Sequence, residues 1–280
     1  MSQSPTCEIQ LLGPVEISSD DASIKISRRV ERAILYYLAA EHRPISRTTL
    51  IDMLWPETDD IDQRRALRTA LSRLRNELPD PEIILTELDR VWIDLNRCKV
   101  DLLIFTELYQ SLQSVLKAYQ EDQTLPAQIV KQLREALSLW HGDRVIHGDN
   151  LSSYPEIDAW RESLNRKLSN QRKTLMERLA DHYQSAGQLQ MALDLFIQLG
   201  TMDVLNVPIH VNILDIFTKL GRHQEALNYC DGLEDAFEQK YNMPLPEPIL
   251  NHCHYARLQL EISKEKNGDK WTLPLTMQLP

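Results

Sequence analysis

The chain has 280 residues, a formal net charge of −10, and 26% charged residues. Aromatic residues make up only 6% and only eight residues are glycine, which indicates a folded, largely helical protein and excludes a disordered or all-β chain. At this length we expect two domains, each with its own core. No stretch approaches the roughly 18 consecutive apolar residues of a membrane span, and the N-terminus lacks a signal-peptide pattern, so we expect a cytoplasmic protein without membrane contact.

Four cysteines are spread along the chain without a C-x-x-C pair. They are Cys7, Cys98, Cys230 and Cys253. This spacing favours reduced, partly buried thiols over disulfides or zinc ligands. His252 and His254 flank one cysteine, but neighbouring side chains on a helix point in different directions and no second ligand cluster completes a metal site. Nucleophile motifs and a Walker sequence are also missing, so we predict no enzyme, no metal and no cofactor.

The start of the chain predicts three short strands followed by two helices. The strands are expected at residues 7–12, 15–17 and 24–26, where short apolar runs alternate with turn residues. The first helix is expected at residues 28–40, where apolar residues at positions 30, 34, 35 and 38 form one face. Pro44 ends it, because proline disfavours a helical residue before it. Ser46 is suited to cap the second helix, which Pro56 stops.

A third helix, predicted over residues 60–78, is the most informative segment. Leucines at positions 67, 71, 74 and 78 define one apolar stripe. Five arginines against two acidic residues give residues 61–78 a net charge of +3, although the whole chain is acidic. A basic, hydrogen-bonding face backed by leucine is suited to insertion into a DNA major groove.

The segment after this helix predicts a β-hairpin. Its strands are expected at residues 82–86 and 91–95, with Val91, Ile93 and Leu95 on one face. Strands, three helices and a terminal hairpin together make a winged helix-turn-helix.

The arginine-rich helix carries most of the predicted DNA contacts. Base-edge contacts suit the residues opposite the leucines, which are Arg65, Thr69, Ser72 and Asn76. Phosphate contacts suit the flanking Arg68 and Arg73, and phosphate contact or carboxylate pairing suits Arg64 and Arg75, which lie closer to the protein. Arg90, at the tip of the hairpin, could enter a minor groove.

The same helix face also has a plainer interpretation, because arginine-rich faces of amphipathic helices are usually only solvated. Residues 1–97 hold 13 Lys and Arg against 17 Asp and Glu, a net charge of −4, whereas groove-binding domains are normally basic. We therefore expect weak binding by one protomer, strengthened by pairing on repeated half-sites or by RNA polymerase.

Residues 50–56 (LIDMLWP) and 65–75 (RALRTALSRLR) resemble the OmpR-type winged helix of the SARP activators, bacterial regulators of specialised gene clusters. The resemblance implies that the third helix enters the major groove, that the wing touches the neighbouring minor groove, and that a small N-terminal sheet packs behind. The hairpin departs from the family pattern, with RVW at residues 90–92 where a glycine followed by an aromatic residue is usual.

The second half of the chain contains a repeat. Residues 186–193 (AGQLQMAL) recur as residues 220–227 (LGRHQEAL). The offset from Gly187 to Gly221 is 34 residues, which is the tetratricopeptide period. We expect the alanine shared by both copies, at positions 192 and 226, to let paired helices approach closely.

Two further segments, residues 135–142 and 233–248, resemble the bacterial transcriptional activator domain that follows the winged helix in SARP regulators. Helices without the repeat signature are expected at residues 101–119 and 129–140, as degenerate repeats or a cap. The chain is therefore predicted to be mainly α.

Three parts are expected. They are an OmpR-type winged-helix domain with a small β-sheet and wing at residues 1–97, an all-α tetratricopeptide-like activator domain at 98–263, and a flexible tail at 264–280, where KEKNGDK breaks the helix.

Two functions fit this organisation. The first is a transcription activator that binds repeats in double-stranded promoter DNA, forms a homo-oligomer there, and recruits RNA polymerase including its sigma subunit. The second is a tetratricopeptide interaction adaptor whose acidic winged helix no longer binds DNA.

Overall fold

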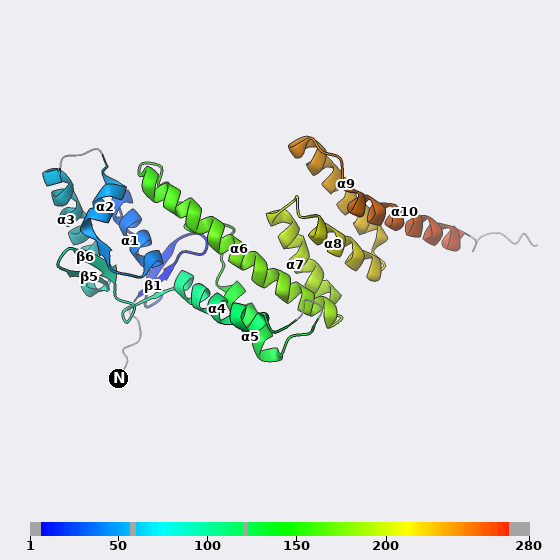
Figure 1. The fold of residues 1–280 in the computed structure, drawn as a ribbon, viewed down its shortest axis with the longest axis horizontal. Coiled ribbons are helices and arrows are strands. Elements are labelled where there is room, and N and C mark those ends of the chain that lie inside the picture. Colours follow the sequence, from blue (N-terminus) through cyan, green and yellow to red (C-terminus); the bar gives the residue numbers. More distant parts are fainter. Residues whose placement is uncertain (1–6, 57–59, 120–122, 269–280) are drawn as a thin grey trace, which may run out of the picture. The chain divides into compact units, whose positions relative to one another are not determined.

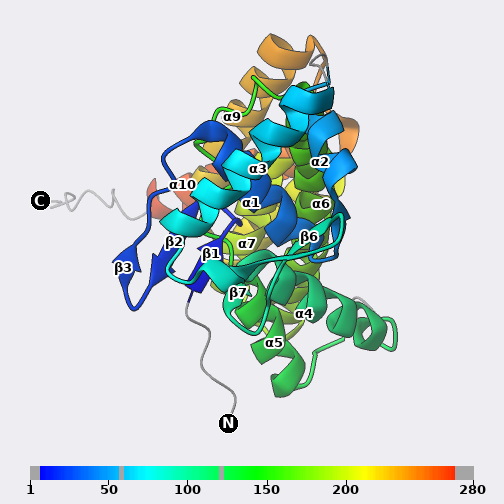
Figure 2. The same cartoon turned by 90° about the vertical axis from the view of Figure 1, so that its left-hand side faces the viewer.

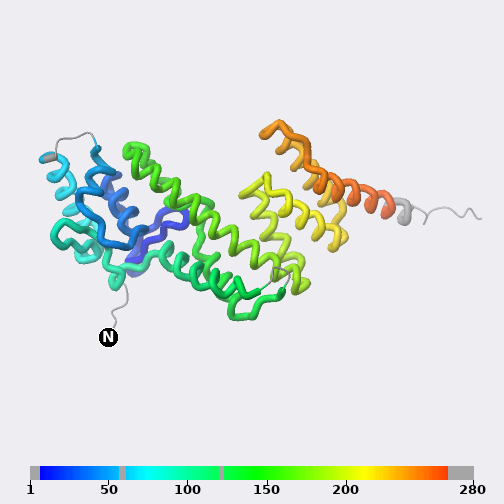
Figure 3. The backbone as a smooth tube through the Cα atoms, viewed as in Figure 1, coloured from blue at the N-terminus to red at the C-terminus, as the bar shows by residue number. Residues whose placement is uncertain are grey.

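The computed structural model describes residues 7–56, 60–119 and 123–268. The chain divides into two compact units. One comprises residues 1–119 and 126–175, and the other comprises residues 120–125 and 176–280. Ten α-helices and two small sheets occur in the described residues, so the predicted mainly α fold is confirmed (Figure 1). Figure 3 traces the same path of the chain as a tube.

The first sheet lies at the start of the N-terminal unit. Its strands are β1 (Cys7–Gln10), β2 (Glu16–Ser19), β3 (Ala22–Ser23) and β7 (Cys98–Val100), in the order β3-β2-β1-β7. The third strand was expected at residues 24–26 but lies at Ala22–Ser23, because Asp20 and Asp21 adopt positive φ angles and form a tight turn directly after β2. Strand β7 pairs parallel to β1. Its three residues are too few to show a periodic pattern, so the sequence did not predict this strand.

Three helices form the centre of the winged helix (Figure 2). They are α1 (Arg29–Glu41), α2 (Arg47–Leu54) and α3 (Asp60–Glu77), close to the predicted ranges. The Ser46 side chain accepts a hydrogen bond from the backbone N–H of Thr49, so the predicted cap of α2 is confirmed. The leucines at positions 67, 71, 74 and 78 are all buried, and α3 packs against α1 and α2.

The wing follows α3 after a short 3-10 helix, η1 (Pro81–Ile83). Strands β5 (Ile84–Glu87) and β6 (Arg90–Ile93) pair antiparallel, and β4 (Ile45–Ser46) joins the other edge of β6. Val91 and Ile93 are buried as predicted. Leu95 is 44% exposed, so its placement on the buried face was wrong: the strand ends at Ile93 and the chain turns before Leu95.

Two further helices pack in the same unit, α4 (Asp101–Leu116) and α5 (Ala127–Ser138), near the predicted positions. The Asp101 carboxylate accepts hydrogen bonds from the backbone N–H groups of Leu11 at 2.8 Å and Leu12 at 3.0 Å. Burial raises the pKa of this carboxyl group, and the backbone donors oppose that rise. The start of α4 is thereby fixed to the end of β1.

The C-terminal unit consists of stacked helical hairpins. It contains the end of α6 (Pro155–Ser185), then α7 (Leu189–Met202), α8 (Val207–Lys219), α9 (His223–Tyr241) and α10 (Glu247–Gly268). The two turns of the repeat have the same geometry, since Gly187 and Gly221 adopt φ angles of 73° and 70°. Ala192 and Ala226 are fully buried, which confirms the predicted close approach of the paired helices.

Two expectations for this unit were wrong. Cys230 of α9 and Cys253 of α10 form a disulfide, because the hairpin fold brings residues 23 positions apart to a Cα–Cα distance of 6.0 Å. Helix α10 also continues to Gly268, past the predicted break at Lys264; the rest of the predicted tail lies outside the described residues. None of the described helices combines the length and apolar character needed to cross a membrane.

Candidate nucleic-acid interface

Helix α3 has one buried and one exposed side. Its leucine stripe packs into the core of the winged helix, so the helix is held against the core from Leu67 onward. The predicted contact residues on the other side are all exposed: Arg64, Arg65, Arg68, Thr69, Ser72, Arg73 and Asn76. The sequence therefore predicted correctly which side of this helix faces solvent.

Three arginines of this surface have no partner among the described residues. Within residues 7–56, 60–119 and 123–268, the guanidinium groups of Arg65, Arg68 and Arg73 make no hydrogen bond or ion pair. The Thr69 hydroxyl donates to the carbonyl of Arg65 at 2.9 Å, which keeps that side chain close to the helix. Guanidinium groups in this state are available for phosphate oxygens or base edges.

Arg75 is placed differently from the other arginines of α3. It is half-buried, and its Nε and Nη2 donate to the carbonyl of Ile84 at 3.0 and 2.9 Å, while Nη2 also donates to the Thr86 hydroxyl at 3.0 Å. Burial lowers the pKa of Arg75, and the nearby charge of Arg47 lowers it further. Arg75 therefore ties the end of α3 to the wing.

The tip of the wing is a tight turn with mixed charge. Leu88 adopts a φ angle of 52° and is 94% exposed, and it stands between Glu87 and Asp89. Arg90 is exposed at the first position of β6, in register with Ser46 of β4 and Glu87 of β5. Its guanidinium group is accessible beside the start of α2, although two carboxylates share the tip.

Two further arginines, Arg43 and Arg47, lie near the start of α2 outside the predicted set, and Arg43 pairs with Glu41 at 3.0 Å. A cavity of about 310 Å³ is lined by residues of the α1–α2 connection, the start of α2 and the wing, including Arg43, Thr49 and Arg90. The Nε of Arg47 is buried and has no hydrogen-bond partner in the described residues. Sequence reasoning missed Arg43 and Arg47 because it placed the positive charge on the third helix and the wing.

A polar network supports the winged helix on the side of α1. The Arg32 Nε donates to both oxygens of Asp149, at 3.0 and 2.9 Å, and the Tyr36 hydroxyl donates to the same carboxylate. Burial raises the pKa of Tyr36, and the adjacent Asp149 raises it further. Since Asp149 follows α5 and precedes α6, these contacts join the winged helix to the segment that leads into α6.

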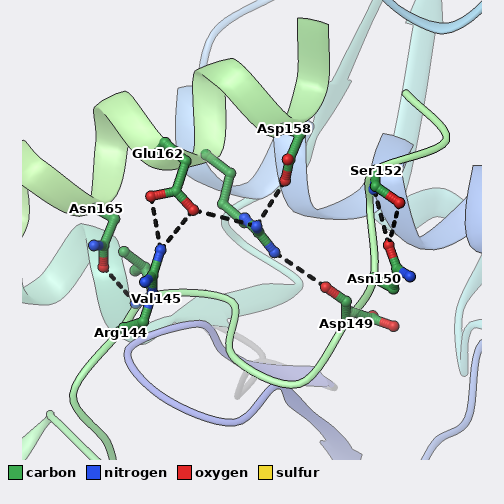
Figure 4. Close-up of polar contacts among 9 residues, drawn as sticks. Arg144, Val145, Asp149, Asn150, Ser152, Asp158, Glu162 and Asn165 are labelled. Carbon is green, nitrogen blue, oxygen red and sulfur yellow. Dashed lines mark hydrogen bonds and ion pairs between the residues drawn. The ribbon is translucent and has the colours of Figure 1, made fainter. Parts of the chain in front are cut away.

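The start of α6 continues this network (Figure 4). Glu162 accepts from Arg144 at 2.6 Å, Asn165 accepts from the backbone N–H of Val145 at 3.0 Å, and Asp158 pairs with Arg161 at 2.6 Å. The ring of Trp160, also on α6, packs edge-on against the ring of Tyr37 of α1, with 4.9 Å between the ring centroids. Helix α1 is thus anchored to α6.

Comparison with protein families agrees with this arrangement. The family described as "Transcriptional regulatory protein, C terminal" matches residues 22–89. The family described as "Bacterial transcriptional activator domain" matches residues 100–240, which is half of the chain. The chain belongs to the SARP-type transcriptional regulators. In this SARP-type chain, the first match covers α1 to the first wing strand, β5, and the second covers the helices from α4 to most of α9.

One solved structure shows the same fold over most of this SARP-type chain. It is Mycobacterium tuberculosis EmbR in complex with a low affinity phosphopeptide, with a TM-score of 0.63 and 18% sequence identity. The similarity covers 91% of this chain but only 65% of the EmbR chain, so the chain spans less than two thirds of that protein. No curated protein sequence matches the chain.

Proposed function

We propose that this SARP-type chain is a sequence-specific DNA-binding transcription activator that places α3 in the major groove of promoter DNA. The observation that carries this proposal is the exposed side of α3, where Arg65, Arg68 and Arg73 have no partner among the described residues while the leucines behind them are buried. A rigid helix with available guanidinium groups can reach base edges and phosphates together.

The residues of the interface divide into four roles. Base-edge contacts are assigned to Arg65, Thr69, Ser72 and Asn76, on the middle of the exposed face. Phosphate contacts are assigned to Arg64, Arg68 and Arg73, and Arg90 of the wing is assigned to the neighbouring minor groove. Arg75 is a positioning residue, since its donors are used on Ile84 and Thr86 and fix the wing against α3.

The acidic charge of the domain limits what one protomer can achieve. A net charge of −4 over residues 1–97 repels phosphates outside the basic helix face, so single-site affinity should be low and strongly salt-dependent. Binding by a homo-oligomer to repeated sites, and contacts with RNA polymerase and its sigma subunit, would add the missing affinity. We accordingly expect the protein in the cytoplasm, on DNA when active.

A mobility-shift assay tests this proposal directly. DNA upstream of the adjoining operon is mixed with the full chain at about 50 mM salt, where phosphate contacts are strongest. We expect a shifted band whose intensity falls steeply as the salt concentration rises. Arg65→Ala and Arg68→Ala should each reduce the fraction of DNA that is shifted. Retardation unchanged by both substitutions would show that α3 is not the reading helix.

The acidic winged helix also supports one second candidate, an interaction adaptor that does not bind DNA. In that case the stacked helices of the C-terminal unit would bind a regulatory protein. Genome-wide footprinting with purified protein that protects no site, together with no shift of the promoter fragment at about 50 mM salt, would favour the adaptor.

A further inference from the structure

Helix α10 has two apolar faces, of which the described residues cover one. Ile249, Cys253 and Ala256 are buried, where α10 packs on α8 and α9. On the opposite side, Tyr255 is 46% exposed, Leu258 is 56% exposed and Ile262 is 42% exposed. Such side chains in one row form a patch, unlike the single exposed apolar residues found on most surfaces.

The exposed row has the spacing of a coiled-coil seam. Its members are Pro248, Asn251, Tyr255, Leu258 and Ile262, all of them exposed. The intervals alternate between three and four residues, which keeps the row on one side of the helix over about four turns. We refer to these five residues as the α10 seam.

Three of the five residues of the α10 seam are large, apolar and exposed. The helix is also held firmly in place, because the disulfide between Cys230 and Cys253 joins its buried face to α9.

We propose that the α10 seam binds the α10 seam of a second copy of this chain, with the two helices antiparallel. In that arrangement Tyr255 lies opposite Leu258 of the second copy, and Asn251 lies opposite Ile262. Each apolar residue at the centre of the seam thus meets an apolar residue of the same patch, as a two-fold interface requires.

Charge complementarity selects this partner and this direction. His254 and Glu261 are exposed on the same flank of the seam. Antiparallel pairing places His254 of one copy beside Glu261 of the other, and the two-fold axis repeats the contact. Hydrogen bonding or ion pairing across this flank supports the antiparallel arrangement.

The small size of the seam sets the expected strength. One row over four turns covers far less than the roughly 1,200 Å² of a stable interface. We therefore expect dissociation constants of about 10 to 100 μM for the free protein, typical of weak association over a small area.

Sedimentation velocity on the full chain, from about 5 to 300 μM and without DNA, tests the pairing. We expect the sedimentation coefficient to rise with concentration, and Leu258→Glu to weaken association at least tenfold. Leu205→Glu is the matched control, because Leu205 is exposed to a similar extent outside α10 and its replacement should change nothing. Equal effects of both substitutions would overturn the proposal.

A charge exchange tests the direction. Glu261→Lys should weaken association, and His254→Glu combined with Glu261→Lys should restore it. A double variant no stronger than the single one would contradict antiparallel pairing. A wild-type chain that stays monomeric at 300 μM, with Leu258→Glu lowering its melting temperature, would show that the seam is covered within the chain and would also overturn the proposal.

These measurements contain no DNA and change no residue of α3. Failure of the seam proposal therefore leaves the proposed DNA contacts untouched, and failure of DNA binding leaves the seam proposal untouched.

Discussion

Two groups of arginines in the N-terminal unit have opposite surroundings. Arg32, Arg144 and Arg161 each bind a carboxylate around the start of α6. Arg65, Arg68 and Arg73 on α3 face solvent, and their guanidinium groups have no partner in the part of the chain that the structure describes.

The difference shows how an acidic protein can still present a basic surface. Acidic residues outnumber basic ones, so carboxylates are plentiful as partners for any arginine. The carboxylates near α6 pair with arginines and hold the unit together. On α3, no carboxylate of the described residues reaches Arg65, Arg68 or Arg73. Placement therefore distinguishes structural arginines from those available to a ligand, and the following experiments test that distinction.

Charge reversal on α3 should have the largest effect. Arg65→Glu with Arg68→Glu replaces two attractive charges by two repulsive ones, so we expect DNA affinity to fall by a thousandfold or more, on the order of 4 kcal/mol. Fluorescence anisotropy with a labelled promoter fragment measures the change. Lys131→Glu with Arg134→Glu alters net charge equally on exposed positions of α5 and should weaken binding only a few-fold.

Removing a structural carboxylate should reduce stability instead. Asp149→Asn leaves Arg32 without its ion pair in a largely buried site, and we expect a loss of about 2 kcal/mol in the free energy of unfolding. Glu162→Gln, in the more exposed pair with Arg144, should cost less than about 1 kcal/mol. Urea unfolding followed by tryptophan fluorescence compares them, and equal losses would contradict the assigned difference in burial.

Salt dependence separates the roles within α3. Arg73→Ala removes a phosphate contact, so the slope of log affinity against log salt should become shallower by about 0.9. Asn76→Ala should keep the slope but reduce the preference for the specific site by about 1–3 kcal/mol. Titrations on specific and unrelated DNA at several salt concentrations measure both quantities. A slope changed by Asn76→Ala and not by Arg73→Ala would reverse the assignment.

Acid should weaken the C-terminal unit slightly. His210 is buried, with Nδ1 2.7 Å from the Tyr229 hydroxyl and Nε2 2.8 Å from the Val204 carbonyl, and burial lowers its pKa. The unfolded chain therefore binds a proton more readily than the folded one, and stability falls as pH drops through about 6.5, the usual value for histidine.

The expected loss between pH 7.5 and 5.5 is smaller than that of Asp149→Asn. Thermal melts at both pH values measure it, and His210→Gln should flatten the dependence. Identical pH profiles for the wild type and the variant would exclude His210 as the cause.

The predictable parts of the fold are those with local signals. Leucine spacing identified the buried side of α3, Ser46 identified the start of α2, and the 34-residue offset identified the paired turns at Gly187 and Gly221. Each signal depends on residues within a few turns of one another. The exposed side of α3 followed directly, because it is the face opposite the leucines.

The parts that were missed depend on contacts between distant residues. Strand β7 becomes a strand only by pairing with β1, and Cys230 meets Cys253 only after α9 and α10 have packed. The hydrogen bond from Arg75 to the wing likewise forms only because folding brings the backbone carbonyl of Ile84 within reach. No periodic pattern in the sequence encodes these approaches.

Cleavage of DNA from a tethered reagent tests the central claim most directly. An iron chelate is attached to Ile61→Cys, an exposed position of α3 outside the assigned contact residues, and, as the control, to Ser138→Cys on α5; both positions are exposed, and the free thiols of Cys7 and Cys98 are buried. We predict discrete cuts inside the protected promoter site from the α3 conjugate and none from the α5 conjugate. Protected DNA that neither conjugate cuts, or that both cut alike, would contradict the placement of α3 in the groove.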